Sequence, residues 1–104
     1  MSAENAQAQI KSDIENNRIC LFMKGVPDAP QCGFSAQVVQ ILEMHQAQYH
    51  AVDVLADWDI REGIKSFSNW PTIPQLYVNG KFIGGCDIVM GHHRKGEMES
   101  ILNG

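Results

Sequence analysis

Residues 19–42, ICLFMKGVPDAPQCGFSAQVVQIL, decide the fold of this chain. The first five of them, Ile19–Met23, form an uninterrupted apolar run, which is typical of a central, buried strand. A proline-flanked loop follows, and apolar residues recur in helical period after Cys32. A cysteine at the start of a helix faces unpaired N–H groups and the positive end of the helix dipole, and both favour the thiolate. The stretch therefore predicts a strand, a loop and a helix that carries a reactive cysteine at its tip.

Ser35 occupies the position, three residues after Cys32, where a dithiol oxidoreductase carries its second cysteine. A hydroxyl donates a hydrogen bond but cannot resolve a mixed disulfide, so any exchange must finish with an outside thiol or another cysteine. The other interpretations are that Cys32 is a buried structural cysteine and that Ser35 is a polar first-turn residue. We favour a reactive Cys32, because structural cysteines prefer apolar element interiors to a proline-flanked helix start.

The segments around this stretch alternate between helical and strand patterns. The expected elements are a helix ending near residues 16–17, the strand 19–23, a helix from Cys32 to about residue 46, a strand at 49–54, a helix capped by Asp57 or Asp59, the strands 75–78 and 81–83, and a last helix from Asp87. Asn79-Gly80 predicts a type I′ hairpin turn, and the strand–helix–strand unit implies a right-handed parallel crossover. This order indicates an α/β, thioredoxin-like fold: a mixed four-stranded sheet flanked by helices, with residues 1–104 as one domain.

Charge and composition exclude several classes of protein. The net charge of −4 argues against a nucleic-acid surface, which needs clustered Lys and Arg. No apolar stretch approaches the ~20 residues of a membrane span, and the N-terminal residues resemble neither a secretory leader nor a transit peptide. Three cysteines without secretory features suggest thiols that are kept reduced. We therefore expect a cytoplasmic protein with no nucleic-acid or membrane partner.

Four motifs follow one another along the chain. They are Lys24, Cys32-Gly33-Phe34-Ser35, Trp70-Pro71-Thr72-Ile73-Pro74 and Gly84-Gly85-Cys86-Asp87. Together, from about Ile10 to Leu102, they resemble the monothiol, CGFS-type glutaredoxins. The resemblance implies that Cys32 is the catalytic residue and that the Ile73–Pro74 peptide bond is cis.

The resemblance also implies a glutathione site. Lys24 and Arg61 would meet its glycyl carboxylate. Its cysteinyl backbone would pair within the segment Thr72-Ile73-Pro74, at Ile73, and its γ-glutamyl end would lie on Cys86 and Asp87. The residues alone leave other interpretations open: Arg61 as a solvated helix charge, Asp87 as a helix cap, and Pro74 as an ordinary proline that opens an edge strand.

A [2Fe–2S] cluster held only by thiolates needs four sulfur ligands, and this chain offers Cys32 as one of them. The resemblance implies a homodimer in which Cys32 of each copy and two glutathione molecules complete the set. The function expected from it is iron–sulfur cluster assembly and transfer, with recipient apo-proteins and a BolA-like protein as partners. The alternative is a glutathione-dependent thiol–disulfide oxidoreductase that removes glutathione from protein thiols. Thiol exchange at Cys32 is expected to be weak beside the carrier role.

The other two cysteines receive separate interpretations. Cys20 lies within the central strand and is expected to be inert core. Cys86 either forms a disulfide with Cys32 on oxidation or contributes only its backbone to the ligand site, and we favour the second.

The adjacent histidines His92 and His93 invite comparison with a metal site. Neighbours point about 100° apart on a helix, and no acidic or cysteine partner stands out nearby, so surface positions are expected. Trp58 and Trp70 are expected to be packing residues.

Overall fold

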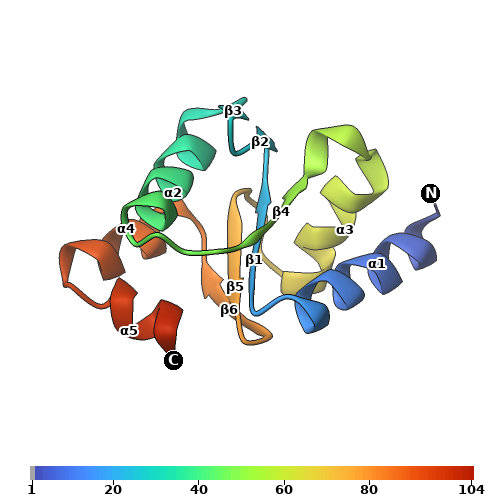
Figure 1. Cartoon of the computed structure of the whole chain (residues 1–104). Helices are drawn as coiled ribbons and strands as arrows, with labels where there is room; N and C mark the ends of the chain where they lie inside the picture. The colour runs from blue at the N-terminus through green and yellow to red at the C-terminus, as the bar shows by residue number, and fades with distance from the viewer. Residues whose placement is uncertain (1) are drawn as a thin grey trace.

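The computed structural model describes residues 2–104, in which helices cover both faces of a central sheet (Figure 1). The elements are α1 (Ala3–Asn16), β1 (Ile19–Met23), β2 (Gly25–Val26), β3 (Ala29–Pro30), α2 (Gly33–Met44), β4 (His50–Asp53), the 3-10 helix η1 (Val54–Ala56), α3 (Trp58–Ser68), β5 (Gln75–Val78), β6 (Lys81–Gly84), α4 (Cys86–Arg94) and α5 (Met98–Asn103). The expected thioredoxin-like fold is confirmed.

The main sheet has the strand order β4-β1-β5-β6. β4 runs parallel to β1, whereas β5 is antiparallel to β1 and β6 is antiparallel to β5. The sheet is therefore mixed, and α2 is the crossover between its two parallel strands. The end of β1 is therefore joined by residues 24–32 to the start of α2, where Cys32 lies.

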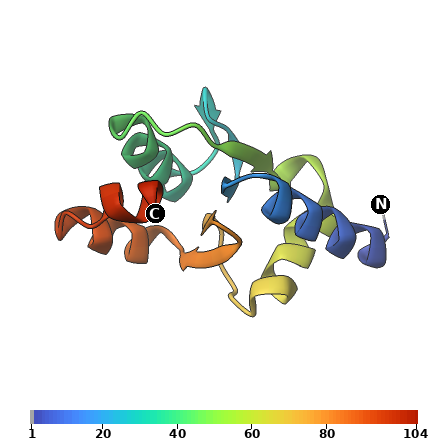
Figure 2. The same ribbon diagram turned by 60° about the horizontal axis from the view of Figure 1, so that its bottom comes forward.

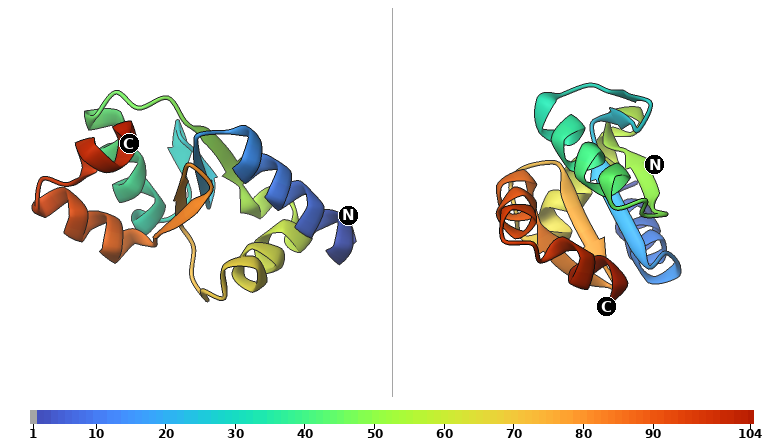
Figure 3. Two further views of the ribbon diagram at one scale, coloured as in Figure 1. Left: turned by 90° about the horizontal axis from the view of Figure 1, so that it is seen from below. Right: turned by 60° about the vertical axis from the view of Figure 1, so that its left-hand side comes forward.

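Two hydrophobic cores lie on opposite faces of this sheet. Figures 1 and 3 show α2, α4 and α5 on one side, and α1 and α3 on the other. β1 serves both cores because successive side chains of a strand point to opposite faces. Leu21 belongs to the core under α2 and α4, whereas Cys20 and Phe22 belong to the core under α1 and α3. The apolar run in the sequence has no polar alternation for this reason.

The hairpin between β5 and β6 follows its sequence signature. Asn79 and Gly80 adopt φ values of 53° and 79°, and a type I′ turn requires a positive φ at both positions. Seen after a 60° turn, this hairpin separates α4 and α5 from α3 (Figure 2).

Several element boundaries differ from those expected. The helix after Cys32 ends at Met44 rather than near residue 46, because Gln46 turns left-handed with a φ of 54°. The single helix expected from Asp87 onward is two helices, α4 and α5, because Gly96 between them adopts a φ of 74° that ends the helical path. The proline-flanked loop contains the small hairpin β2–β3, which sequence periodicity did not reveal.

Within residues 2–104, no helix combines the length and the apolar character that a bilayer crossing requires.

Candidate functional site

Cys32 is the N-cap of α2. Its Sγ accepts a hydrogen bond of 3.3 Å from the backbone N–H of Ser35. Burial opposes ionisation, but the Ser35 hydroxyl, the N–H groups of Ser35 and Phe34 and the charge of Lys24 together lower the pKa of this thiol below its ordinary value. The half-buried sulfur therefore lies where a thiolate is favoured.

Ser35 connects the two elements on either side of this sulfur. Its side chain is fully buried, and its Oγ accepts a hydrogen bond of 3.1 Å from the backbone N–H of Lys24. The same Oγ lies 3.3 Å from Cys32 Sγ. Because the Lys24 N–H occupies a lone pair of the oxygen, the hydroxyl proton is free to point at the sulfur. Ser35 is thus more than a polar residue of the first turn.

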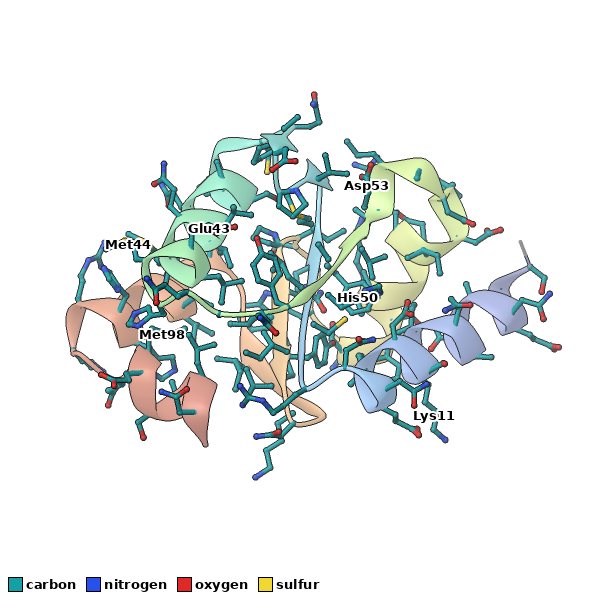
Figure 4. All side chains as sticks on the ribbon, in the orientation of Figure 1. Lys11, Glu43, Met44, His50, Asp53 and Met98 are labelled. Carbon is teal, nitrogen blue, oxygen red and sulfur yellow. The ribbon has the colours of Figure 1, made fainter. Side chains whose placement is uncertain are left out.

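The loop between β1 and α2 is closed at both ends. The N–H of Gln31 donates to the carbonyl of Lys24 over 2.8 Å, and the N–H of Gly25 donates to a carboxylate oxygen of Asp53 over 2.9 Å. Figure 4 shows Asp53 at the end of β4 that faces β2. Gly25 has a φ of 91°, and a Cβ there would lie 2.7 Å from the carbonyl oxygen of Ala29. Only glycine fits this position without displacing backbone.

A cavity of about 330 Å³ lies at the start of α2, where Phe34 lines it; Cys32 itself is not one of its lining residues. The backbone along one of its walls contains the cis Ile73–Pro74 peptide bond, as the family resemblance implied. The residues that line the cavity are Lys24, Phe34, Trp70, Thr72, Ile73, Pro74, Gly85, Cys86, Asp87 and Ile88. Six of the seven residues expected to bind glutathione therefore line this one cavity: Lys24, Thr72, Ile73, Pro74, Cys86 and Asp87. A larger hollow of about 550 Å³, at Arg18 and His45, lies at the opposite end of β1 and contains no cysteine.

The segment after β6 brings small residues to this cavity. The N-cap of α4 is Gly85, which has no side chain to cap the helix. Asp87 lies in the first turn of α4 and is therefore not the cap. The Asp87 side chain is exposed. Cys86 Sγ donates to the side-chain oxygen of Gln37 over 3.1 Å. Burial, Asp87 and Cys32 raise the pKa of the Cys86 thiol, which therefore remains protonated where Cys32 ionises.

Arg61 is not among the residues that line the cavity. Its guanidinium carbon lies 5.4 Å from the centre of the Trp58 ring, and its buried Nε has no hydrogen-bond partner among residues 2–104. Trp58, which was expected to be a packing residue, is 66% exposed and belongs to neither core; its ring lies under the Arg61 guanidinium instead. Trp70 does pack, with its ring 5.7 Å from that of Phe82.

The remaining cysteine and histidines lie outside the cavity. Cys20 is fully buried, as expected. Its burial, and to a smaller extent the charge of Asp13, raises the pKa of its thiol to about 12. His92 has an acidic partner that the sequence did not reveal, because its Nδ1 lies 2.8 Å from a carboxylate oxygen of Glu97. Among residues 2–104, no three His, Cys, Asp or Glu side chains gather in a way that could hold a metal ion.

Sequence reasoning missed the supporting residues of the site. Asp53, Gln37 and Gln75 each contact a site segment through a hydrogen bond, and Ile88 lines the cavity. Asp53 and Gln37 act across 28 and 49 positions of sequence, so no local pattern could have identified them.

Comparisons with known proteins agree with this geometry. The family model described as Glutaredoxin matches residues 19–83. A monothiol glutaredoxin of Synechocystis is 51% identical over 96 residues, which cover 92% of this chain and 90% of that protein. The mitochondrial glutaredoxin-related protein 5 of Danio rerio is 48% identical over 103 residues, 98% of this chain. The chain spans only 66% of the length of that zebrafish relative.

Two solved structures share the fold. Reduced apo GrxS14 of poplar has a TM-score of 0.82 and 40% identity, with 96% of this chain and 93% of that chain covered. A buckwheat glutaredoxin–glutathione complex has a TM-score of 0.85 and 25% identity, with 97% and 90% covered. With a single thiol at the tip of α2, a serine three residues later and relatives of the same kind over nearly all of its length, this chain belongs to the monothiol glutaredoxins.

Proposed function

We propose that this chain carries a [2Fe–2S] cluster between two of its copies and delivers it to other proteins. The observation that carries the proposal is the solitary sulfur of Cys32, whose environment favours the thiolate and whose neighbour at the usual resolving position is Ser35. A cluster held only by thiolates needs four sulfur ligands. One chain supplies one, so the others must come from a second copy and from small thiols.

Glutathione is the thiol whose chemistry suits the cavity at the start of α2. It has two carboxylates and one amine, and the cavity offers the ammonium of Lys24 to a carboxylate and the carboxylate of Asp87 to the amine. Ile73 offers its backbone to the cysteinyl residue. The buckwheat glutaredoxin–glutathione complex supports the proposal, because its fold is shared. Arg61 would reach the glycyl carboxylate from its place on Trp58.

Such a cluster would leave easily, since half of its ligands are held only through a small molecule, and a carrier needs that property. The partners proposed are a second copy in the cluster-bound form, a BolA-like protein and recipient apo-proteins. Removal of glutathione from protein thiols is not favoured as the main role. Ser35 cannot resolve a mixed disulfide, and the Cys86 thiol is protonated and engaged with Gln37.

Anaerobic reconstitution with iron, a cysteine desulfurase with cysteine, and reduced glutathione tests the proposal. We expect the parent protein to become coloured and to run as a dimer, and Cys32→Ser to remain a colourless monomer. Cys20→Val removes a fully buried cysteine of β1 that lies outside the cavity; it is the matched control and is expected to colour like the parent. Omission of glutathione should also prevent colour. A Cys32→Ser protein that holds iron and sulfide as firmly as the parent would overturn the proposal.

A further inference from the structure

Gln75 is a fully buried polar side chain at the start of β5, and both its amide nitrogen and its amide oxygen are hydrogen-bonded. Its Nε2 donates to the carbonyl oxygens of Trp70 and Thr72, over 3.1 and 3.0 Å. Its Oε1 accepts from the hydroxyl of Tyr77 over 3.1 Å. Buried polar groups are costly unless they are bonded, so this amide is held in one orientation by three partners.

The two bonded carbonyls belong to the segment that lines the cavity. Trp70 and Thr72 both line it, together with Ile73 and Pro74. Within residues 2–104, Ile73 itself makes no backbone hydrogen bond, so its N–H and C=O remain available. The amide of Gln75 therefore fixes the segment from the core side and leaves the groups of Ile73 free on the cavity side.

We propose that Gln75 is a positioning residue for glutathione: its amide fixes residues 70–74 so that the backbone of Ile73 can pair with the ligand. This inference rests on the proposed function, which assigns glutathione to the cavity. The side-chain chemistry is specific, because one nitrogen with two protons must reach two carbonyl oxygens. A glutamate has no N–H to give and would place a carboxylate against both carbonyls. An asparagine keeps the amide but is one methylene too short to reach both.

The experiment compares two reactions of Cys32. In the first, the Cys32 thiolate attacks a sulfur of glutathione disulfide, the disulfide bond breaks, a Cys32–glutathione mixed disulfide forms and one glutathione thiolate leaves. In the second, iodoacetamide alkylates the same thiolate without a peptide-binding step. For Gln75→Glu and Gln75→Asn we expect the rate with glutathione disulfide to fall about tenfold, which corresponds to an increase of about 1.4 kcal/mol in the activation free energy. The rate of alkylation by iodoacetamide should stay within about twofold of the parent.

Tyr77→Phe is the matched control, because it removes a bond of equal length from the same buried network while both loop carbonyls keep their donor. It should retain the parent's ratio of the two rates. If Gln75→Glu does not fold, Gln75→Asn carries the test. A Gln75→Asn protein that keeps the parent's rate with glutathione disulfide, or that loses both rates equally, would overturn the inference alone. A parent that reacts with cystine as fast as with glutathione disulfide would overturn the glutathione site and the inference together.

Discussion

At the scale of single residues, the three cysteines of this chain differ in what surrounds each sulfur. Cys32 faces two backbone N–H groups, a hydroxyl and a nearby ammonium, which stabilise a negative charge. Cys20 lies in an apolar core close to the carboxylate of Asp13, and Cys86 lies close to that of Asp87, so both thiols have raised pKa values. Only Cys32 is therefore a thiolate candidate at neutral pH, although all three share one side-chain chemistry.

Replacement of Ser35 by alanine tests this environment. The variant loses the hydroxyl that faces the sulfur, so we expect the pKa of Cys32 to rise and the pH midpoint of its alkylation by iodoacetamide to move upward. The Lys24 N–H also loses its acceptor, which should lower the free energy of unfolding by about 1–3 kcal/mol. Rates between pH 5 and 9 measure the first effect, and urea denaturation measures the second.

Ser12→Ala is the control for this prediction, because Ser12 is an exposed serine in α1 whose hydroxyl accepts a hydrogen bond from the side chain of Asn16, one helical turn away. Its free energy of unfolding should stay within about 0.5 kcal/mol of the parent. An alkylation midpoint in Ser35→Ala equal to that of the parent would contradict the role given to the hydroxyl.

At the scale of elements, local patterns identified what is locally determined. The Asn79-Gly80 turn and the apolar run of β1 follow from neighbouring residues, and the structure contains both. The cap of α3 was expected at Asp57 or Asp59, and the structure has it at Asp57. The β2–β3 hairpin was missed because its two strands have two residues each, too few for a period. The role of Gln75 was missed as well, because its position in the sequence is that of an ordinary strand residue. Only the folded path of residues 70–74 brings the carbonyls of Trp70 and Thr72 to its amide.

Replacement of Gly25 by alanine tests the hairpin that closes the loop before Cys32. A Cβ would meet the carbonyl oxygen of Ala29 at 2.7 Å and the backbone nitrogen of Gln31 at 2.8 Å, in a left-handed conformation that disfavours side chains. Because the obstacles are backbone atoms, we expect a loss of more than about 2 kcal/mol in the free energy of unfolding. Urea denaturation followed by circular dichroism measures it.

The opposite result is expected for Gly91→Ala in α4. A Cβ at Gly91 meets nothing within 4 Å, so alanine should stabilise the helix by about 0.5–1 kcal/mol. Equal effects of the two substitutions would show that backbone crowding at Gly25 does not govern the loop.

At the scale of the whole molecule, the sheet separates two cores, and each contains a buried titratable side chain. Cys86 lies in the core under α2 and α4. Cys20 and Tyr77 lie in the core under α1 and α3, where Phe22 packs edge-on against Tyr77 at 5.8 Å between ring centres. Burial raises the pKa of Tyr77 to about 12, as it does that of Cys20. The core under α1 and α3 thus holds two side chains that keep their protons well above their ordinary pKa values.

Alkaline unfolding tests the burial of these two side chains. The pKa of Cys20 is about 12 in the folded state against an ordinary 9.0, so the unfolded thiol loses its proton first as the pH rises. The contribution of Cys20 is complete below pH 9.0 and is lost as the pH rises toward 12, and stability falls across that window. We expect the urea midpoint of the parent to fall between pH 8 and pH 11, and that of Cys20→Val, which has no titrating group there, to fall less steeply. Because Tyr77 also ionises in this range, the urea midpoint of Cys20→Val should still fall somewhat with pH. Adding Tyr77→Phe to Cys20→Val should make that fall smaller. Parallel curves for the parent and Cys20→Val would mean that the core under α1 and α3 does not exclude the thiolate.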